Sequence, residues 1–340
     1  MLGEALTATE PAGPPRTTTM SMLEAIRTTL AAEMARDERV VVFGEDVATL
    51  GGVFRVTQGL EERFPGRVFD TPLAEGAIVG ASLGMAIGGL VPVPEIQFLG
   101  FTHQAFHQIG PQLARYRSRS HGRYHVQVTI RAPYGGGTRT PEFHPDALES
   151  QFAQAPGLKI VSPAFPDDAK GLLAQAVRDP DPVLFLEPQR LYRSCRGEVP
   201  ATDHTIPFGR SRLVRPGSDL TLIAWGGPVH LCLEAATRLQ ETGASVGVLD
   251  LRSLVPLDVE GLLRAVRGTG RAVVVQEAPL TGGFGAEVAA TLQEEAFAAL
   301  DAPVRRVAGR DVPYPPGSLE DHFLPSVPRI VAAARTTLEF

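Results

Sequence analysis

Apolar residues along this chain follow two alternating patterns. An amphipathic helix is predicted over residues 23–36, and the continuous apolar run Val40-Val41-Val42-Phe43 follows it. The alternation continues to residue 187, with strands predicted at 92–97, 126–131, 159–162 and 183–187 and helices at 76–89, 102–117 and 166–178. Strands that are apolar throughout and separated by helices indicate a parallel sheet covered on both faces.

A second α/β unit follows a stretch, residues 188–207, that has no sustained period and is rich in Arg, Ser, Gly and Pro. Strands are predicted there at 220–225, 245–250, 272–276 and 304–307, and helices at 229–241, 258–267 and 283–300. We therefore expect an α/β protein with two three-layer α/β domains. The expected parts are a disordered tail at 1–19, a first domain at 20–195, a linker at 196–207 and a second domain at 208–340.

Composition agrees with this division and narrows the function. The chain has 340 residues, of which 44% are hydrophobic, enough for two cores. Its net charge is −6 and its pI is near 5.8, so it carries no positive surplus for binding a phosphate backbone. A nucleic-acid partner is not expected.

The cysteines and the first residues bear on the compartment. Cys195 and Cys232 form neither a CxxC pair nor part of a His cluster, which argues against a zinc site and a disulfide scaffold. The first 20 residues lack the basic flank and apolar run of a signal peptide. Only Lys159 and Lys170 among the 32 basic residues are lysine, a bias typical of a GC-rich bacterial genome. The expectation is a cytoplasmic bacterial protein.

Residues 76–94 carry no charge, which raises the question of a membrane span. Five of these residues are Gly and two are Pro, and Glu75 and Glu95 flank them. A buried helix followed by a buried strand explains this composition better than a span does. No membrane association is expected.

Glycines recur every four residues along the predicted helix, at 76, 80, 84 and 88, and so share one face. Each costs about 1 kcal/mol relative to Ala in a helix interior, so the ridge needs a compensating contact. Close approach of a second helix provides one. That helix belongs either to the same domain or, as we favour, to a partner chain.

Glu75 begins this helix, and its position has two interpretations. A carboxylate in the first helical turn is stabilised by the helix dipole, which is a purely structural role. Alternatively, the carboxyl group lies in an apolar pocket, where desolvation raises its pKa into a range useful for proton exchange.

Other motifs give weaker signals. The loop Gly135-Gly-Gly137 before His144 has the composition either of a flexible connection or of an anion cradle. His103 and His107 have i, i+4 spacing but no third ligand nearby in sequence, which argues against zinc. The basic residues Arg115, Arg117, Arg119 and Arg123 indicate a solvated or interface face rather than phosphate binding. Rossmann, Walker A and nucleophile-elbow motifs are absent.

Six segments together resemble the β subunit of the thiamine-dependent decarboxylase of 2-oxo acid dehydrogenase complexes. They are Phe43-Gly-Glu-Asp-Val47, Gly51-Gly-Val-Phe-Arg55, Thr71-Pro-Leu-Ala-Glu75, Glu95-Ile-Gln-Phe98, Leu249-Asp-Leu-Arg252 and Glu277-Ala-Pro-Leu280. The similarity covers roughly residues 20 to 338. Gly-Gly-Val-Phe looks more like the branched-chain enzymes than the pyruvate enzymes.

The resemblance implies a first domain that binds the aminopyrimidine of thiamine diphosphate and a second domain like the C-terminal domain of transketolase. Glu75, Gly80 and Gly84 match the family's Glu-x4-Gly-x3-Gly motif. Glu75 would then hydrogen-bond the pyrimidine ring nitrogen. The cofactor-binding residues implied are Glu45, Glu75, Gln97, Phe98 and Phe101, with Phe101 packing on the ring and His144 serving 2-oxo acid binding and acyl transfer to lipoamide.

The resemblance also implies a partner. Magnesium and the diphosphate are bound in these enzymes at a Gly-Asp-Gly motif, which this sequence lacks. Since a diphosphate binds poorly without charge neutralisation, another chain must supply Mg²⁺. The family supplies an α subunit, in an α2β2 heterotetramer, and a dihydrolipoyl acyltransferase core that receives the acyl group.

We therefore predict a 2-oxoisovalerate-type, branched-chain dehydrogenase β subunit. Two alternatives stay open: a pyruvate or acetoin dehydrogenase β subunit, and a non-catalytic assembly subunit. Departures from the family pattern occur at Gly100, His107 and Gly110 and in the residues after His144, Pro145-Asp-Ala147. The resemblance also implies a monovalent cation, K⁺, at positions matching Val126, Val128, Thr129, Ala176, Asp179 and Asp181.

Overall fold

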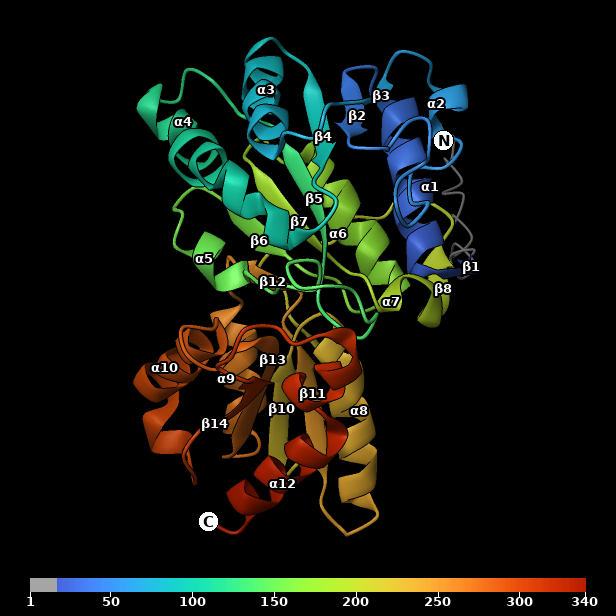
Figure 1. Ribbon diagram of the computed structural model, residues 1–340. Coiled ribbons are helices and arrows are strands. Elements are labelled where there is room, and N and C mark those ends of the chain that lie inside the picture. The colour runs from blue at the N-terminus through green and yellow to red at the C-terminus, as the bar shows by residue number, and fades with distance from the viewer. Residues whose placement is uncertain (1–16) are drawn as a thin grey trace, which may run out of the picture.

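A computed structural model describes residues 17–340 as two α/β domains, shown one above the other in Figure 1. Each domain has a mostly parallel sheet with helices on its faces, as the alternating apolar pattern predicts. The predicted fold class is confirmed. Residues 1–16, most of the expected tail, lie outside the described residues.

The first sheet has seven strands in the order β12-β6-β7-β5-β4-β2-β3. Their bounds are β2 (Val40–Gly44), β3 (Val68–Asp70), β4 (Val91–Glu95), β5 (Thr129–Tyr134), β6 (Lys159–Val161), β7 (Val183–Pro188) and β12 (Ser253–Val255). Neighbouring strands are parallel except β12, which runs antiparallel to β6. Because β12 comes from the second half of the chain, the two halves share this sheet.

Helices cover both faces of the first sheet. They are α1 (Met22–Arg36), α2 (Leu60–Arg63), α3 (Glu75–Ile87), η1 (Leu99–Ala105), η2 (Gln108–Ala114), α4 (Arg115–Arg119), α5 (Glu149–Ala153), α6 (Pro166–Arg178) and α7 (Leu191–Ser194). Helix α1 begins with a capping box, in which the Ser21 side chain accepts from the Glu24 N–H and the Glu24 carboxylate accepts from the Ser21 N–H.

The helix predicted at 102–117 is not a regular helix. The structure divides this stretch into the 3-10 segment η1, the π-helical segment η2 and the short helix α4. Pro111 lies inside η2, and its missing N–H prevents a continuous i to i−4 hydrogen-bond ladder. This irregular backbone directly follows the residues Gln97 and Phe98.

The second sheet has five strands in the order β14-β13-β10-β11-β9, with β9 antiparallel to β11. The strands are β9 (Arg212–Arg215), β10 (Leu220–Ala224), β11 (Val246–Asp250), β13 (Ala272–Pro279) and β14 (Arg305–Gly309). The helices are α8 (Gly227–Gln240), α9 (Val259–Arg267), α10 (Gly285–Ala296), η3 (Phe297–Ala299), η4 (Gly317–Leu319), α11 (Glu320–Phe323) and α12 (Val327–Leu338). The sequence pattern did not predict β9 or α12.

A third, two-stranded sheet corrects the expected tail and linker. Strand β1 (Thr17–Ser21) pairs antiparallel with β8 (Arg196–Pro200). Residues 17–19, expected in the tail, and the first part of the expected linker are therefore ordered against each other. Neither strand shows a strong apolar pattern, because five of their ten residues, Thr17, Thr18, Thr19, Arg196 and Glu198, are exposed.

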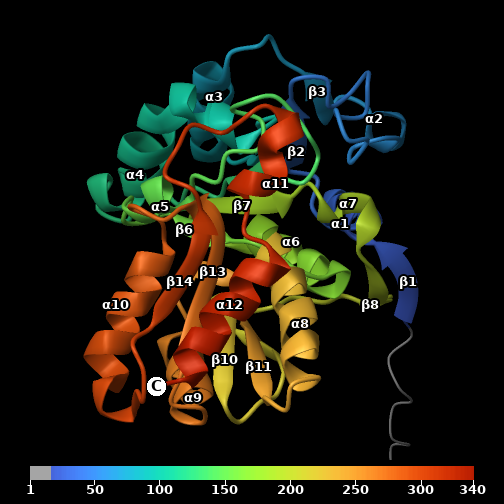
Figure 2. The same cartoon turned by 60° about the horizontal axis from the view of Figure 1, so that its bottom comes forward.

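The two domains share one buried apolar cluster, which runs from Ile130 and Tyr134 in the first domain to Trp225 and Leu249 in the second. Figure 2 shows α11 of the second domain beside the loops of the first. Cys195 and Cys232 are both buried and unpaired, as expected. Over residues 17–340, no helix has the length and apolar character needed to cross a bilayer.

Candidate functional site

The predicted site residues begin at the carboxyl edge of the first sheet. Strands β2 and β4 are parallel neighbours, with Gly44 opposite Glu95, so the residues after both strands emerge side by side. The Gln97 amide donates to Oδ2 of Asp46 at 3.0 Å, which ties these two segments together. Gly44 is required here because a Cβ would collide with the carbonyl oxygen of Glu95. Glu45 and Gln97 thus lie at one edge of the first sheet.

Glu75 is the first residue of α3 and is buried, with 3% of its surface exposed. Within residues 17–340 its carboxylate has no salt bridge or hydrogen bond to another side chain. Buried carboxylates are normally paired or hydrogen-bonded. Glu75, at the start of α3, departs from this rule within the described residues.

Glu45 is buried near enough to Glu75 for the charge of Glu75 to act on it. Burial, followed by the charges of Glu75 and Asp46, raises the pKa of Glu45 to about 7. Its Oε1 is buried and has no hydrogen-bond partner within the described chain. Glu45 therefore binds a proton near neutral pH and has an oxygen without a partner in the described chain.

The rings of Phe98, Phe101 and His144 form an aromatic cluster. The centroid of the His144 ring lies 4.4 Å from that of Phe98 and 5.1 Å from that of Phe101. Phe98 and Phe101 meet edge to face at 5.5 Å. The structure thus brings together three predicted site residues from two separate segments.

The orientation of His144 leaves one ring nitrogen available. Nδ1 lies 3.1 Å from the carbonyl oxygen of Glu142. Because a carbonyl can only accept, Nδ1 must carry the proton, and in the neutral ring Nε2 has the free lone pair. His144 can therefore accept a proton or a hydrogen bond at Nε2.

The N–H groups of the triple-glycine loop bind two carboxylates of this same chain. The N–H of Gly136 donates to Glu277 at 2.7 Å, and the N–H of Gly137 donates to Glu320 at 2.9 Å. Both carboxylates come from the second domain, and burial raises the pKa of Glu277. The interpretations as a free anion cradle and as a flexible loop are both corrected: the loop joins the two domains.

A buried ionic network was missed by sequence reasoning. Arg131 in β5 lies between Glu95 and Glu187, and the hydroxyl of Tyr192 donates to Glu187. Arg131 interrupts an otherwise apolar strand pattern, as do the two carboxylates at the ends of their strands. Arg131, a charged residue inside a segment expected to be buried, was the feature of the sequence that could have predicted this network.

The residues of the implied cation site lie in two neighbouring segments. Thr129 pairs with Val183 at the start of β5 and β7, which brings residues 126–129 beside Asp179 and Asp181. Lys159 pairs with both aspartates. Thr129 Oγ1 is buried without a partner in the described chain, but the charges of the aspartates are already balanced. The donor set therefore fits a monovalent cation only in part.

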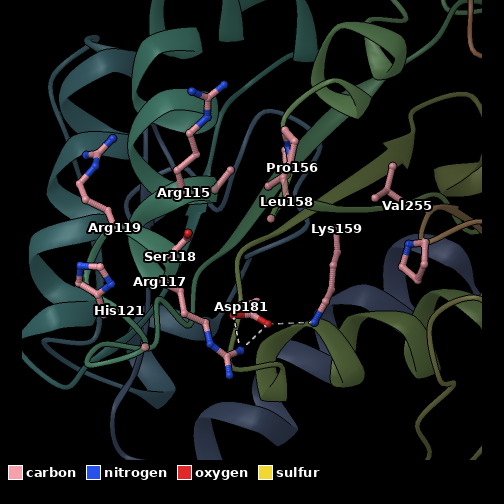
Figure 3. Close-up of a pocket in the computed structure, with 14 residues that line it drawn as sticks. Arg115, Arg117, Ser118, Arg119, His121, Pro156, Leu158, Lys159, Asp181 and Val255 are labelled. Atoms are coloured by element: carbon pink, nitrogen blue, oxygen red, sulfur yellow. Dashed lines mark hydrogen bonds and ion pairs between the residues drawn. The ribbon is translucent and has the colours of Figure 1, made fainter.

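Three of the basic residues, Arg115, Arg117 and Arg119, line a cavity of about 1090 Å³ (Figure 3). Arg117 and Lys159 both reach Asp181, while Arg115 and Arg119 point away from it in this view. Arg119 donates instead to Gln112 and to the carbonyl oxygen of Pro111. Since the charged ends do not converge, the cavity agrees with a solvated or interface face better than with a phosphate site.

The zinc interpretation of the histidine pair finds no support. Among residues 17–340 no group of three or more His, Cys, Asp or Glu side chains could hold a metal ion. His107 instead lies 2.8 Å from the side-chain amide of Gln112.

Comparison with known proteins places this geometry in a family. Residues 18–194 match the transketolase pyrimidine binding domain, and residues 209–330 match the transketolase C-terminal domain. A solved structure described as "Split gene transketolase, inactive beta4 tetramer" is similar with a TM-score of 0.78 and 26% identity, over 94% of this chain and 98% of the other.

Curated relatives are more similar in sequence. Pyruvate dehydrogenase E1 component subunit beta from Staphylococcus epidermidis is 50% identical over 322 residues, which are 94% of this chain and 99% of the relative. The protein of the same name from Bacillus subtilis is 48% identical with the same coverage. This chain therefore belongs to the transketolase-like E1 β subunits of the thiamine-diphosphate-dependent 2-oxo acid dehydrogenases.

Proposed function

We propose that this chain, together with an α subunit, decarboxylates a 2-oxo acid on thiamine diphosphate and passes the acyl group to the lipoyl group of an acyltransferase. One observation carries the proposal: a buried Glu75 without a partner, beside Glu45 with a pKa raised to about 7, at the carboxyl edge of the first sheet. Ligands of parallel α/β sheets bind at this edge.

The pocket residues fit an aminopyrimidine. This ring has nitrogen acceptors and an amino donor on its edge, and two apolar faces. The orphaned Oε1 of Glu45 and the unpaired carboxylate of Glu75 can match the edge, while the rings of Phe98 and Phe101 can match a face. Gln97, held by Asp46, lies at the same edge of the sheet.

In this proposal Glu75 contacts the pyrimidine ring nitrogen, and Glu45 holds a proton beside it near neutral pH. When bound, the cofactor supplies the electron sink for decarboxylation. The burial of both carboxyl groups keeps water from competing for these hydrogen bonds. His144, with Nε2 free, contacts the 2-oxo acid and exchanges a proton during acyl transfer.

Pyruvate is the substrate that the relatives favour, because both carry the name pyruvate dehydrogenase. A branched-chain 2-oxo acid is the second candidate. It is favoured by the segment Gly51-Gly-Val-Phe54, whose Phe54 ring lies 5.7 Å from that of Phe98. Turnover of pyruvate, 2-oxoisovalerate and acetoin by one preparation separates these candidates.

The partner proposal rests on an unfilled face of α3. A Cβ built on Gly80 or Gly84 meets no atom of residues 17–340 within 4 Å, so this part of the ridge does not pack on the described chain, whereas Gly76 approaches the carbonyl oxygen of Gln104. We propose that it packs on a partner chain in an α2β2 assembly, and that the α subunit holds Mg²⁺ and the diphosphate. Potassium at the partly fitting site near Asp181 also stays a proposal.

The test is Glu75→Gln in the reconstituted α–β complex, with Glu61→Gln in the first turn of α2 as the exposed control. We expect Glu75→Gln to abolish 2-oxo acid decarboxylation while assembly persists, and Glu61→Gln to behave as the wild type. Wild-type turnover by Glu75→Gln would overturn the role of Glu75. Calorimetry that finds no thiamine diphosphate binding to the wild-type complex would instead favour the non-catalytic alternative.

A further inference from the structure

We propose that Gly100 is a positioning residue for His144. Because Gly100 has no side chain, His144 can lie against Phe98 and Phe101. This position of His144 narrows the space for the acyl group of the substrate, in favour of a small 2-oxo acid. The inference rests on the proposed function and adds to it the device that sets substrate size. Gly100 lies in η1, between the two phenylalanines.

Gly100 is in direct contact with the backbone of the loop that carries His144. A Cβ on Gly100 would lie 2.8 Å from the carbonyl carbon and 3.1 Å from the Cα of Phe143, and it would overlap the carbonyl oxygen of Phe143. These atoms are backbone, so they cannot move aside by rotating a side chain. Any side chain at position 100 must therefore displace the peptide between Phe143 and His144.

The loop is held by its backbone and not by burial of Phe143. The Phe143 side chain is 53% exposed, and its φ of 70° is in the left-handed region that a bulky residue rarely adopts. The Asp146 N–H donates to the carbonyl oxygen of Phe143 at 3.4 Å, and the Gln189 amide donates to that of His144 at 3.4 Å. A shift at Phe143 is therefore carried to His144.

The consequence concerns both proton transfer and space. His144 contacts both rings, at centroid distances of 4.4 and 5.1 Å, so no acyl branch fits between His144 and the phenylalanines. Moving the loop outward takes Nε2 of His144 away from the 2-oxo acid and opens a space between His144 and the two phenylalanines. Turnover of pyruvate should fall, while a branched 2-oxo acid should lose less.

The test compares Gly100→Ala with Gly110→Ala in the reconstituted α–β complex. Position 110 is a matched control, because its Cβ would meet only the Cβ of Ala155, at an ordinary 3.7 Å. We expect Gly100→Ala to lower kcat/KM for pyruvate about tenfold or more, with unchanged thiamine diphosphate affinity. The ratio of kcat/KM for pyruvate to that for 2-oxoisovalerate should fall about fivefold. Gly110→Ala should keep wild-type values.

A second variant keeps the proposal testable if Gly100→Ala fails to assemble. Phe143→Pro forces φ to about −65°, which the present loop cannot accommodate, and it removes no buried side chain. It should produce the same loss and the same change in the substrate ratio. An unchanged substrate ratio in the variants that assemble would overturn the proposal. A wild-type complex that turns over no 2-oxo acid would instead overturn the proposed function, so the two failures are distinguishable.

Discussion

The guanidinium of Arg131 donates from Nη1 to Oε2 of Glu95 at 2.7 Å, and both side chains are buried beneath the candidate site. Nε and Nη2 of the same guanidinium donate to the carboxylate of Glu187 at 2.7 and 3.0 Å. Glu95 ends β4, two residues before Gln97. This ionic network therefore joins three central strands at the point where the site residues emerge.

Replacing Arg131 by Met should strongly destabilise the protein. The substitution leaves two buried carboxylates without a cation, and breaking such a pair from one side costs about 3–5 kcal/mol in the free energy of unfolding. The control is Arg264→Met, which breaks an exposed pair with Glu260 and should cost under about 1 kcal/mol. Chemical denaturation followed by circular dichroism compares them. Equal midpoints for the two variants would contradict the prediction.

Glu45 should make stability depend on pH. Its pKa is raised to about 7 in the folded state, above the usual 4.5 of a glutamate, so the folded state binds more protons between these pH values. Stability contributed by the protonated group is therefore lost as the pH rises from about 4.5 to 7.

Glu45→Gln should remove this loss and stabilise the cofactor-free protein by about 1–2 kcal/mol at pH 8, with little effect at pH 4.5. Thermal melting across this pH range measures it, with exposed Glu62→Gln as the control. A variant whose melting temperature follows the wild-type pH curve would show that Glu45 is not the group responsible.

Gly84→Leu should block assembly without harming the fold. Position 84 faces open space, and Leu is favoured over Gly inside a helix by roughly 1 kcal/mol. A side chain there would prevent a partner helix from approaching closely. Light scattering of the α–β mixture measures the mass, and Ala35→Leu on the exposed face of α1 is the control. Normal assembly by Gly84→Leu would place the partner elsewhere.

Glu320→Ala should loosen the contact between the domains. Its carboxylate accepts from the Gly137 N–H and from the Tyr314 hydroxyl, at 2.9 and 2.8 Å. Without it these donors lose their partners, at a cost of about 1–3 kcal/mol each where they stay buried. Limited proteolysis should then cleave residues 138–146 faster than in Glu339→Ala, which changes an exposed carboxylate. Equal cleavage rates would argue that the loop is held by other contacts.

Local pattern was sufficient for the two-domain α/β fold, because strands buried on both faces must be apolar throughout and the helices that cover them must be amphipathic. For Glu75, the acid at the start of an uncharged helix, the pattern left a structural and a functional role open, and only the family resemblance favoured the functional one. It failed for η1 and η2, where Pro111 interrupts the helix, and for β1 and β8, whose pairing is their main support.

Only the tertiary structure decided how separate segments combine. The placing of His144 against Phe98 and Phe101 depends on a loop that folds onto Gly100, and the N–H groups of the triple-glycine loop bind carboxylates of the other domain. Arg131 is tolerated in a core because Glu95 and Glu187 arrive from neighbouring strands. The physical reason is that such contacts join residues far apart in sequence, so the periodicity of apolar residues in a short segment cannot predict them. The burial of a strand or a helix, in contrast, fixes which residues of each short segment are apolar.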